Sequence, residues 1–485
     1  MDILVLTGSP KGEVSVTLQY VTYLRKTRPA HRFEVLEVAR EVGRLERTPS
    51  AWEALEGALR RADLVLWAFP VYVLLVPSQY KRFLELLLER GAGSLLAGKY
   101  AAALSTSIRY FDHTAHQYVH AVSDDLGLKY LGFHSAGMLD LLEAEGRGRL
   151  DRFADFVESA VARAVPVQRT HPPLRWPELT YVPQTPPRVS PLGGRRAVIV
   201  TDDDGRSPNL AAMTDRLARA FSGAVEVVNL HQVDIRGGCL GCLHCGYDNV
   251  CAYTDGFADF FQTKLASADI VVLAGAVRDR ALSSKWKQFF DRTFYKGHVP
   301  SFGGKQVGLL VAGPLAQLPH LRQALAAWAD TYEYHAHFLT DEVATSGELD
   351  SLVDALAERL VRSAETGYVP ARTFLGVGGR KLLRDSLYGP LRVPFRADIR
   401  YYHAHGGFDF PQGDYRTRLA NALLLPLTWL APARRWLYTH ANQKLVEPFG
   451  QVLRAVPVAS AGALAPAPSA SSPPPEDAPR PANGA

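Results

Sequence analysis

Hydrophobic runs of strand length alternate with helical stretches through residues 1–165. Five runs rich in β-branched and aromatic residues begin at Asp2, Arg32, Asp63, Lys99 and Lys129, and they read DILVLT, RFEVLEV, DLVLWAF, KYAAALST and KYLGFHSA. Between them, apolar positions recur with the period of an α-helix, as in residues 77–91 and 150–165. Because this alternation is typical of parallel strands joined by crossover helices, it predicts an α/β domain with a doubly wound parallel sheet. Its ligand site is expected at the carboxyl ends of the strands.

The same pattern returns farther along the chain. The run that starts at Ala62 corresponds to the run that starts at Ala268, and the same offset carries Gly98-Lys99 onto Gly304-Lys305. The strand-like runs of this second copy are RAVIVTD, AVEVVNL, DIVVLAGAV, KQVGLLVAG and YHAHFLTDEV. We therefore predict two α/β domains in tandem, residues 1–165 and 196–365. Eight prolines between Pro166 and Pro191 mark residues 166–195 as a linker.

The alternation stops after residue 365. Residues 366–455 are rich in Arg and aromatic side chains, with 13 Lys and Arg against 5 Asp and Glu. The segment therefore has a net charge of +8, whereas the rest of the chain has −3, which gives the total of +5. We predict a mainly helical segment that packs against the two domains, which leaves contact with a membrane surface or an acidic partner open. Its apolar run at residues 421–430 is too short to span a bilayer and contains Pro426. Residues 456–485 form a low-complexity tail that we expect to be disordered.

Composition narrows the class of protein further. The chain has four cysteines in 485 residues, all within residues 239–251, so no disulfide framework ties distant loops together. That usage is typical of a reducing compartment, and the start of the chain reads as a first strand rather than a signal peptide. We expect a cytoplasmic protein without a transmembrane segment, and the sequence contains no recognisable nucleic-acid-binding module.

Three loops of the first copy fall at the same edge of the predicted sheet. The first, GSPKGEVSVT after the first strand, offers backbone N–H groups, hydroxyls and a helix N-terminus to a phosphate, although an ordinary turn has a similar composition. The third strand ends at Pro70-Val71-Tyr72, just before a helix that opens with PSQYKRF, and the fourth ends at Ser105-Thr106-Ser107. The three loops together favour a cofactor site.

GSPKG, PVY followed by PSQYKRF, and STS resemble the NADPH-dependent FMN reductase and flavodoxin-like superfamily. The resemblance covers most of residues 1–165 and implies an FMN site with NAD(P)H as a candidate electron donor. It implies that the phosphate is held by Ser9, Lys11, Ser15 and Thr17, and that the ring is lined by Pro70, Val71, Tyr72, Ser105, Thr106 and Ser107. Catalysis would then rest on the cofactor rather than on a protein nucleophile.

Two further residues follow the fourth strand. Tyr110 and His113 lie beside the expected flavin loop and are candidate substrate contacts. Solvated loop histidines are the commoner case, and we expect no metal site among them.

The second copy departs from the flavin pattern at each loop. Its first loop, TDDDGRSPNL, places Asp202, Asp203 and Asp204 where a phosphate would be repelled. The PVY and STS positions hold Ala276-Val277-Arg278 and Val311-Ala312-Gly313. We therefore expect one FMN per chain, bound by the first domain.

The four cysteines of the second copy have the spacing C-x2-C-x2-C-x5-C, through Cys239, Cys242, Cys245 and Cys251. A structural zinc site usually presents two separated C-x2-C pairs, whereas a 4Fe-4S cluster uses three closely spaced thiolates and a fourth nearby, as in the C-x2-C-x2-C-x3-C run of ferredoxins. The spacing favours a 4Fe-4S cluster over zinc, and redox-active dithiols are the third alternative.

A flavodoxin-like domain with this compact cysteine motif resembles the iron-sulfur flavoproteins of anaerobic microbes. The resemblance implies an oxidoreductase or electron-transfer protein that couples FMN to a 4Fe-4S cluster, with NAD(P)H or a ferredoxin-like carrier as redox partner. Here the two sites are divided between two fused copies, so we expect an intrachain pseudo-dimer, and homo-oligomerisation stays open. The alternative is a non-catalytic binding protein in which the cysteines hold structural zinc.

Overall fold

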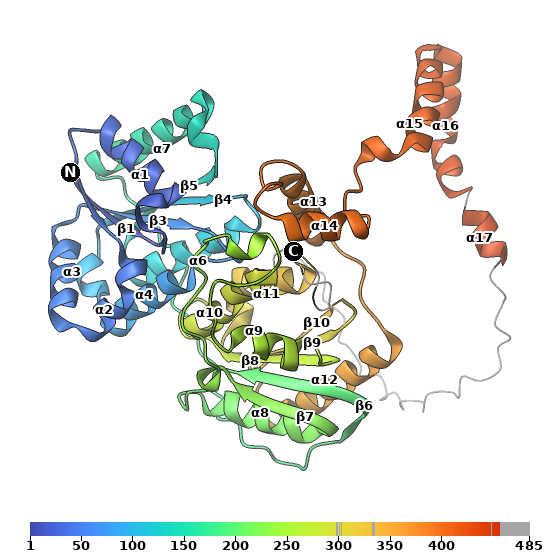
Figure 1. Cartoon of the computed structure of the whole chain (residues 1–485), viewed down its shortest axis with the longest axis horizontal. Coiled ribbons are helices and arrows are strands. Elements are labelled where there is room, and N and C mark those ends of the chain that lie inside the picture. The colour runs from blue at the N-terminus through green and yellow to red at the C-terminus, as the bar shows by residue number, and fades with distance from the viewer. Residues whose placement is uncertain (297–298, 300, 302, 332–334, 448, 456–485) are drawn as a thin grey trace, which may run out of the picture. The chain divides into compact units, whose positions relative to one another are not determined.

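Two five-stranded parallel sheets form the framework of the first 365 residues (Figure 1). The computed structural model describes residues 1–296, 299, 301, 303–331, 335–447 and 449–455. The first sheet contains β1 (Asp2–Thr7), β2 (Arg32–Leu36), β3 (Leu64–Pro70), β4 (Tyr100–Ser107) and β5 (Lys129–Gly137). The second contains β6 (Ser190–Thr201), β7 (Phe221–Asn229), β8 (Ile270–Ala276), β9 (Gln306–Ala312) and β10 (His335–Thr340).

The strand order is β2-β1-β3-β4-β5 in the first sheet, and its repeat, β7-β6-β8-β9-β10, in the second. Neighbouring strands pair in parallel in both sheets. The predicted fold class, two tandem flavodoxin-like domains, is confirmed.

Helices cover both faces of each sheet. The first domain contains α1 (Val16–Thr27), α2 (Val38–Arg47), α3 (Pro49–Arg61), α4 (Ser78–Glu89), α5 (Gly93–Leu96), α6 (Asp112–Asp125) and α7 (Ala144–Ala162). The second contains α8 (Pro208–Ala220), α9 (Phe257–Phe260), α10 (Ser284–Thr293), α11 (Pro319–Thr331) and α12 (Ser346–Thr366).

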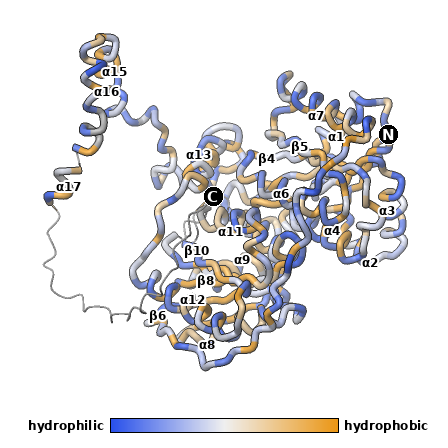
Figure 2. The backbone as a smooth tube through the Cα atoms, turned by 180° about the vertical axis from the view of Figure 1, so that it is seen from behind, coloured by the Kyte–Doolittle hydropathy of each residue, from blue (hydrophilic) through white to orange (hydrophobic). Residues whose placement is uncertain are grey.

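Alternate side chains of the strands enter different cores. In β3, Val65, Trp67 and Phe69 face α2, α3, α4 and α6, whereas Leu64, Leu66 and Ala68 face α1 and α7. The second sheet divides in the same way, with α8 and α12 on its outer face. The hydrophobic strands therefore run through the interior of each domain, as Figure 2 shows for β8. Side chains on each strand alternate between the two faces of the sheet, and this alternation made the strands recognisable in the sequence.

The inner faces of the two sheets share one hydrophobic core, because α4 packs on α10 and α6 packs on α11. These are equivalent helices of the two copies, so the domains pack through an approximate two-fold relation. Phe83 of α4 and Phe289 of α10 are both fully buried in this layer. Figure 1 shows the four helices between the two sheets.

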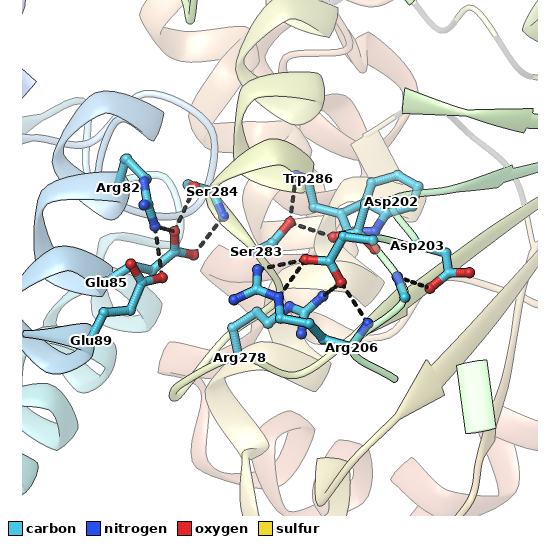
Figure 3. A network of polar contacts seen from close by, with 12 residues as sticks. Arg82, Glu85, Glu89, Asp202, Asp203, Arg206, Arg278, Ser283, Ser284 and Trp286 are labelled. Carbon is cyan, nitrogen blue, oxygen red and sulfur yellow. Dashed lines mark hydrogen bonds and ion pairs between the residues drawn. The ribbon is translucent and has the colours of Figure 1, made fainter. Parts of the chain in front are cut away.

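Helices α4 and α10 are joined by two carboxylates, one from each helix, that hydrogen-bond to the start of the other helix. Glu85 of α4 accepts hydrogen bonds from the Ser284 backbone N–H (2.7 Å) and hydroxyl (2.6 Å) at the start of α10. Asp291 of α10 accepts one from the Ser78 backbone N–H (2.7 Å) at the start of α4. Each helix thus supplies a carboxylate to the N-terminus of the other, where it satisfies a free N–H and favours the helix dipole. The Glu85 side of this exchange is drawn in Figure 3.

Residues 165–189 contain no helix or strand, yet they are fixed to both domains. The His171 backbone N–H donates to Asp124 of α6 (2.9 Å). Farther along, the Tyr181 hydroxyl donates to Asp350 of α12 (2.7 Å), and Tyr181 is buried. The proline-rich segment is therefore an ordered strap.

Two short helices complete the first of the two units into which the contacts divide the chain, Met1–Phe408 and Asp409–Ala485. They are α13 (Phe374–Tyr388) and α14 (Arg396–Ala404), and they form a small core around Leu387, Leu391 and Phe395. The second unit contains α15 (Tyr415–Leu424), α16 (Ala431–Val446) and α17 (Phe449–Ala455). No helix among the described residues is long and apolar enough to cross a membrane. The predicted disordered tail, residues 456–485, lies outside the described residues.

Candidate functional site

A cavity of about 270 Å³ opens at the carboxyl ends of β1, β3 and β4. Most of the residues predicted to hold FMN line it, namely Ser9, Lys11, Ser15, Thr17, Pro70, Val71, Tyr72, Thr106 and Ser107. Tyr110 lines it as well. Ser105 and His113 do not: the Ser105 hydroxyl contacts His116 Nε2 (2.8 Å), and His113 Nε2 contacts Gln323 Oε1 (3.0 Å) on α11.

The first loop presents donors at the start of α1. Ser15 is the N-cap of this helix, and its hydroxyl accepts a hydrogen bond from the Leu18 backbone N–H (3.4 Å). The Thr17 and Thr106 hydroxyls lie 2.6 Å apart and tie this loop to the end of β4. Lys11 forms no ion pair with any carboxylate in the described part of the chain. A free ammonium beside a helix N-terminus is a site for a phosphate.

The loop after β3 forms the second wall. The Val71 backbone N–H donates to the Thr106 carbonyl (3.1 Å), which holds this loop beside the end of β4. The Tyr72 hydroxyl is buried and has no hydrogen-bond partner among the described residues. A buried hydroxyl without a partner is costly, so a polar ligand atom at this position would satisfy it. Together with Lys11 and Ser15, it fits a phosphate-bearing, ring-containing cofactor.

The cysteine loop of the second domain closes the same cavity. Cys239, Gly241 and Leu243 are part of its lining, although they are separated from the first-domain loops by more than 130 residues. Gly241 has φ +63°, and a Cβ there would lie 2.6 Å from Lys11 Cε and closer still to the Tyr72 hydroxyl. Only glycine fits this approach without displacement. The backbone of the cysteine loop therefore lies directly on the first-domain loops.

All four cysteines line one small cavity beneath the first, and all are free thiols. Cys239, Gly241, Leu243 and Phe294 belong to the lining of both cavities. Among the described residues, no three of the cysteine sulfurs lie within 4.8 Å of one another. A tetrahedral zinc ion with Zn–S bonds of about 2.3 Å would bring its sulfurs to about 3.8 Å from one another. The donor set of four thiols on a glycine-rich loop fits a larger, cluster-type core.

Burial governs the chemistry of these thiols. Burial, followed by the charge of Asp291, raises the pKa of Cys239 to about 12. Burial and Cys251 raise the pKa of Cys245 to about 11. A metal bound by these two thiols would replace their protons, because the thiolate is the metal ligand.

Two lysines interact with Cys239 through their charge: Lys11 is partly buried and Lys287 is buried. Burial lowers the pKa of Lys11, whereas Cys239 and Cys242 raise it. Burial also lowers the pKa of Lys287, whereas its ion-pair partner Asp291 and then Cys239 raise it. These ammonium groups favour a site that becomes negatively charged when the thiols are ligated.

The equivalent edge of the second domain has a different character. A cavity of about 510 Å³ lies there, and the strap residues Trp176, Pro177, Glu178, Leu179 and Thr180 form one of its walls. Asn209, in the first loop of this domain, donates to the Leu179 carbonyl (2.7 Å). The ring of Trp176 lies against Gly313, at the position of the STS loop.

The acidic first loop of this domain is internally paired (Figure 3). Asp204 accepts hydrogen bonds from Arg206 and Arg278, and Asp202 accepts one from the Ser283 hydroxyl. The arginines that could have held a phosphate are therefore already engaged, and the strap covers the remaining wall. This provides a physical reason for our prediction that the second domain binds no flavin.

Several lining residues were not identified from the sequence. Trp328 of α11 and Phe294 contribute from the second domain, and Leu383, Leu391 and Phe395 contribute from α13 and the segment before α14. They give the cavity an apolar wall opposite the first-domain loops. No local motif marks them, because they reach the site only through the packing of the two domains.

The fold and the loops at its edge define a flavodoxin-like α/β protein. Residues 1–157 match the family model described as "Flavodoxin-like fold", and residues 201–347 match the model described as "NADPH-dependent FMN reductase". The chain thus carries two flavodoxin-like, FMN reductase-type domains in tandem. These matches support a flavin-dependent NAD(P)H oxidoreductase-like function.

Several solved structures match part of the chain. FerB, a flavoenzyme NAD(P)H:(acceptor) oxidoreductase from Paracoccus denitrificans, is 18% identical over 33% of this chain and 97% of its own, with a TM-score of 0.26. An FMN-dependent NADH-azoreductase from Bacillus anthracis, in complex with FMN, is 13% identical over 34% of this chain and 100% of its own, with a TM-score of 0.25. RosB with a bound flavin intermediate is 15% identical over 44% and 87%, with a TM-score of 0.29. No curated protein matches the chain.

Proposed function

We propose that this protein is a flavin-dependent oxidoreductase in which FMN, bound by the first domain, exchanges electrons with a 4Fe-4S cluster held by the second. The observation that carries the proposal is the shared lining of the two cavities by Cys239, Gly241, Leu243 and Phe294. NAD(P)H or a ferredoxin-like carrier is the proposed redox partner.

The first-domain residues would hold and orient FMN. Lys11 and the N-terminus of α1, with Ser9, Ser15 and Thr17, would bind the phosphate, and Pro70 to Tyr72, Thr106 and Ser107 would position the ring. The apolar wall from Trp328, Leu391 and Phe395 would exclude water from the ring. Tyr110 is the lining residue best placed as a substrate contact.

The second-domain residues would hold the cluster through Cys239, Cys242, Cys245 and Cys251. FMN supplies two-electron hydride chemistry, and a 4Fe-4S cluster supplies single-electron transfer, so their proximity would convert one into the other. Arg292 holds the loop in place: it forms a buried ion pair with Asp255 (2.7 Å) and donates to the Gly237 carbonyl (3.1 Å). The intrachain pairing of the domains brings the two sites together.

Cofactor content tests this proposal. Protein purified and reconstituted without oxygen is expected to contain about one FMN, four iron and four sulfide ions per chain. Cys242→Ala is expected to lose most of the iron and sulfide, because it removes a thiolate ligand. Val250→Ala, an exposed position in the same loop, is the matched control and is expected to keep both. A colourless protein with zinc on the cysteines would instead establish the structural-zinc alternative.

A further inference from the structure

A second set of metal-ligating side chains lies away from the flavin cavity and the cysteine loop. Among the described residues, His120, Asp124 and His171 form the one group of His, Cys, Asp or Glu whose ligand atoms all lie within 4.8 Å of one another. His120 and Asp124 are one turn apart on α6 and share a face, whereas His171 comes from the strap. The sequence did not reveal the group, because its third member joins only when the strap folds back on α6.

The distances in this group match those of a metal site. Asp124 Oδ2 lies 2.9 Å from His171 Nδ1 and 3.6 Å from His120 Nε2. A tetrahedral zinc ion with bonds of about 2.0 Å separates its ligand atoms by about 3.3 Å, between these two values. The two imidazole rings stand edge to face at 86°, with centroids 4.6 Å apart, so their nitrogens converge on the carboxylate from different directions.

The surroundings orient the three side chains. Asp124 is buried, and its Oδ2 also accepts hydrogen bonds from the Thr170 (3.2 Å) and His171 (2.9 Å) backbone N–H groups. The His120 ring stacks on the Tyr130 ring, with centroids 4.2 Å apart. Such outer contacts fix the direction of ligands in metal sites.

An unsatisfied group lies beside the cluster. The Tyr130 hydroxyl is buried and has no hydrogen-bond partner in the described part of the chain. The ring of Tyr130 stacks on that of His120, so this hydroxyl belongs to the surroundings of the group. Three protein ligands leave a fourth tetrahedral position, and a water bound there would have Tyr130 as a partner.

We propose that His120, Asp124 and His171 bind a divalent transition-metal ion, with Zn²⁺ as the representative of the class. Two imidazoles and one carboxylate suit such an ion, whereas Mg²⁺ and Ca²⁺ prefer all-oxygen sites. The ion takes the place of the direct contact between His171 Nδ1 and Asp124 Oδ2 and connects the start of the strap to α6.

The contact between the strap and α6 is also the place where the second domain contacts the first. Arg280 of the second domain forms an ion pair with Asp125 (2.6 Å), next to Asp124, and donates to the Pro172 carbonyl (2.7 Å), next to His171. A metal ion at the proposed site would therefore stabilise the point at which the first domain, the strap and the second domain meet.

Zinc content in matched variants tests the proposal. The full chain, with its cysteines in the same state in every sample, is dialysed against limiting free Zn²⁺ and the bound zinc is counted. The wild type is expected to hold one more equivalent than His120→Ala, His171→Ala or Asp124→Asn. The control is His31→Ala, a histidine of similar exposure (21%, against 24% and 25%) that pairs with Glu158. Any zinc bound by the cysteines is the same in every sample, so it does not contribute to the difference in zinc content between wild type and variant.

A second readout uses stability. Zn²⁺ is expected to raise the urea midpoint of the wild type and of His31→Ala but not of the three site variants, since a ligand of the folded state stabilises it by mass action. Three independent substitutions keep the test decisive if one of them fails to fold. Equal zinc content and equal midpoint shifts in the wild type and the folded site variants would overturn the proposal.

Discussion

Gly241 is a residue at which the backbone of the second domain closely approaches the first. It adopts φ +63°, and its Cα faces the Lys11 and Tyr72 side chains without room for a methyl group. A residue in the left-handed region costs roughly 1 kcal/mol when glycine is replaced, whatever surrounds it. At Gly241 the clash with the flavin-cavity wall adds to that cost, so the position links local backbone geometry to the site itself.

Gly241→Ala is therefore expected to lower FMN affinity by at least about tenfold, because Lys11 or Tyr72 must move. FMN titration followed by fluorescence measures the effect. The control is Gly205→Ala, a glycine with φ +80° and no atom within 4 Å of its Cβ position, so it carries the same backbone strain without the clash. Equal loss of affinity in both variants would show that strain alone is responsible.

His116 carries a pH dependence of stability. Its side chain is buried, stacks on Phe133 and contacts the Ser105 hydroxyl, and burial lowers its pKa to about 4 from an ordinary value of 6.5. Between these two values the unfolded chain binds a proton that folded His116 does not. Stability is therefore complete above pH 6.5 and is lost as the pH falls toward 4.

His116→Gln is expected to remove this contribution. Between pH 6.5 and pH 5, the free energy of unfolding of the wild type is expected to fall by about 2 kcal/mol more than that of the variant. Urea unfolding at both pH values measures the difference. His320 and His337, whose pKa values burial also lowers to about 4, are present in both proteins and do not affect the comparison. Parallel pH profiles would show that His116 does not titrate in this way.

Among the secondary-structure elements, the strands and their order could be predicted from the sequence. Only part of the lining of the candidate site could be predicted in the same way. DILVLT and DLVLWAF became β1 and β3, because a period of two between two helical layers is a local pattern. The strap, β6 from Ser190 and the apolar wall from α13 depend on contacts between segments far apart in the chain. No window of sequence reports such contacts, which is why the entry of Cys239 and Gly241 into the first-domain cavity was not predicted in detail.

Helices α4 and α10 each cap the N-terminus of the other with a buried carboxylate, and these contacts hold the domain interface together. Glu85 is buried and accepts hydrogen bonds from Lys81 (2.7 Å), Arg82 (3.1 Å) and Ser284. Lys81, itself fully buried, also pairs with Asp279 of the second domain (3.1 Å). Removing one member of a buried network of this kind leaves its partners unpaired in a medium that solvates charge poorly.

Glu85→Ala is expected to reduce the free energy of unfolding by about 3–5 kcal/mol. Glu89→Ala, on the same helix, is the control: Glu89 is 41% exposed and pairs with Arg82, so its loss is expected to cost about 1 kcal/mol or less. Urea unfolding of both variants measures the difference. Similar values for the two would mean that the reciprocal capping does not stabilise the interface.

In the whole molecule, we propose that the duplication has divided two tasks between similar domains. The first copy keeps the loops for a phosphate-bearing cofactor, and the second has the cysteine loop, an acidic first loop paired with its own arginines, and a strap over its equivalent edge. Pairing through α4, α6, α10 and α11 brings the specialised parts of both copies to one place. We propose that these parts form one electron-transfer unit within a single chain.

Stopped-flow spectroscopy on the anaerobic protein with both cofactors tests this claim most directly. After rapid reduction of the flavin, the cluster absorbance is expected to bleach at a rate that does not change when the protein concentration is varied tenfold, because both centres belong to the same chain. A rate proportional to protein concentration would show that the centres meet only between molecules and would contradict the account.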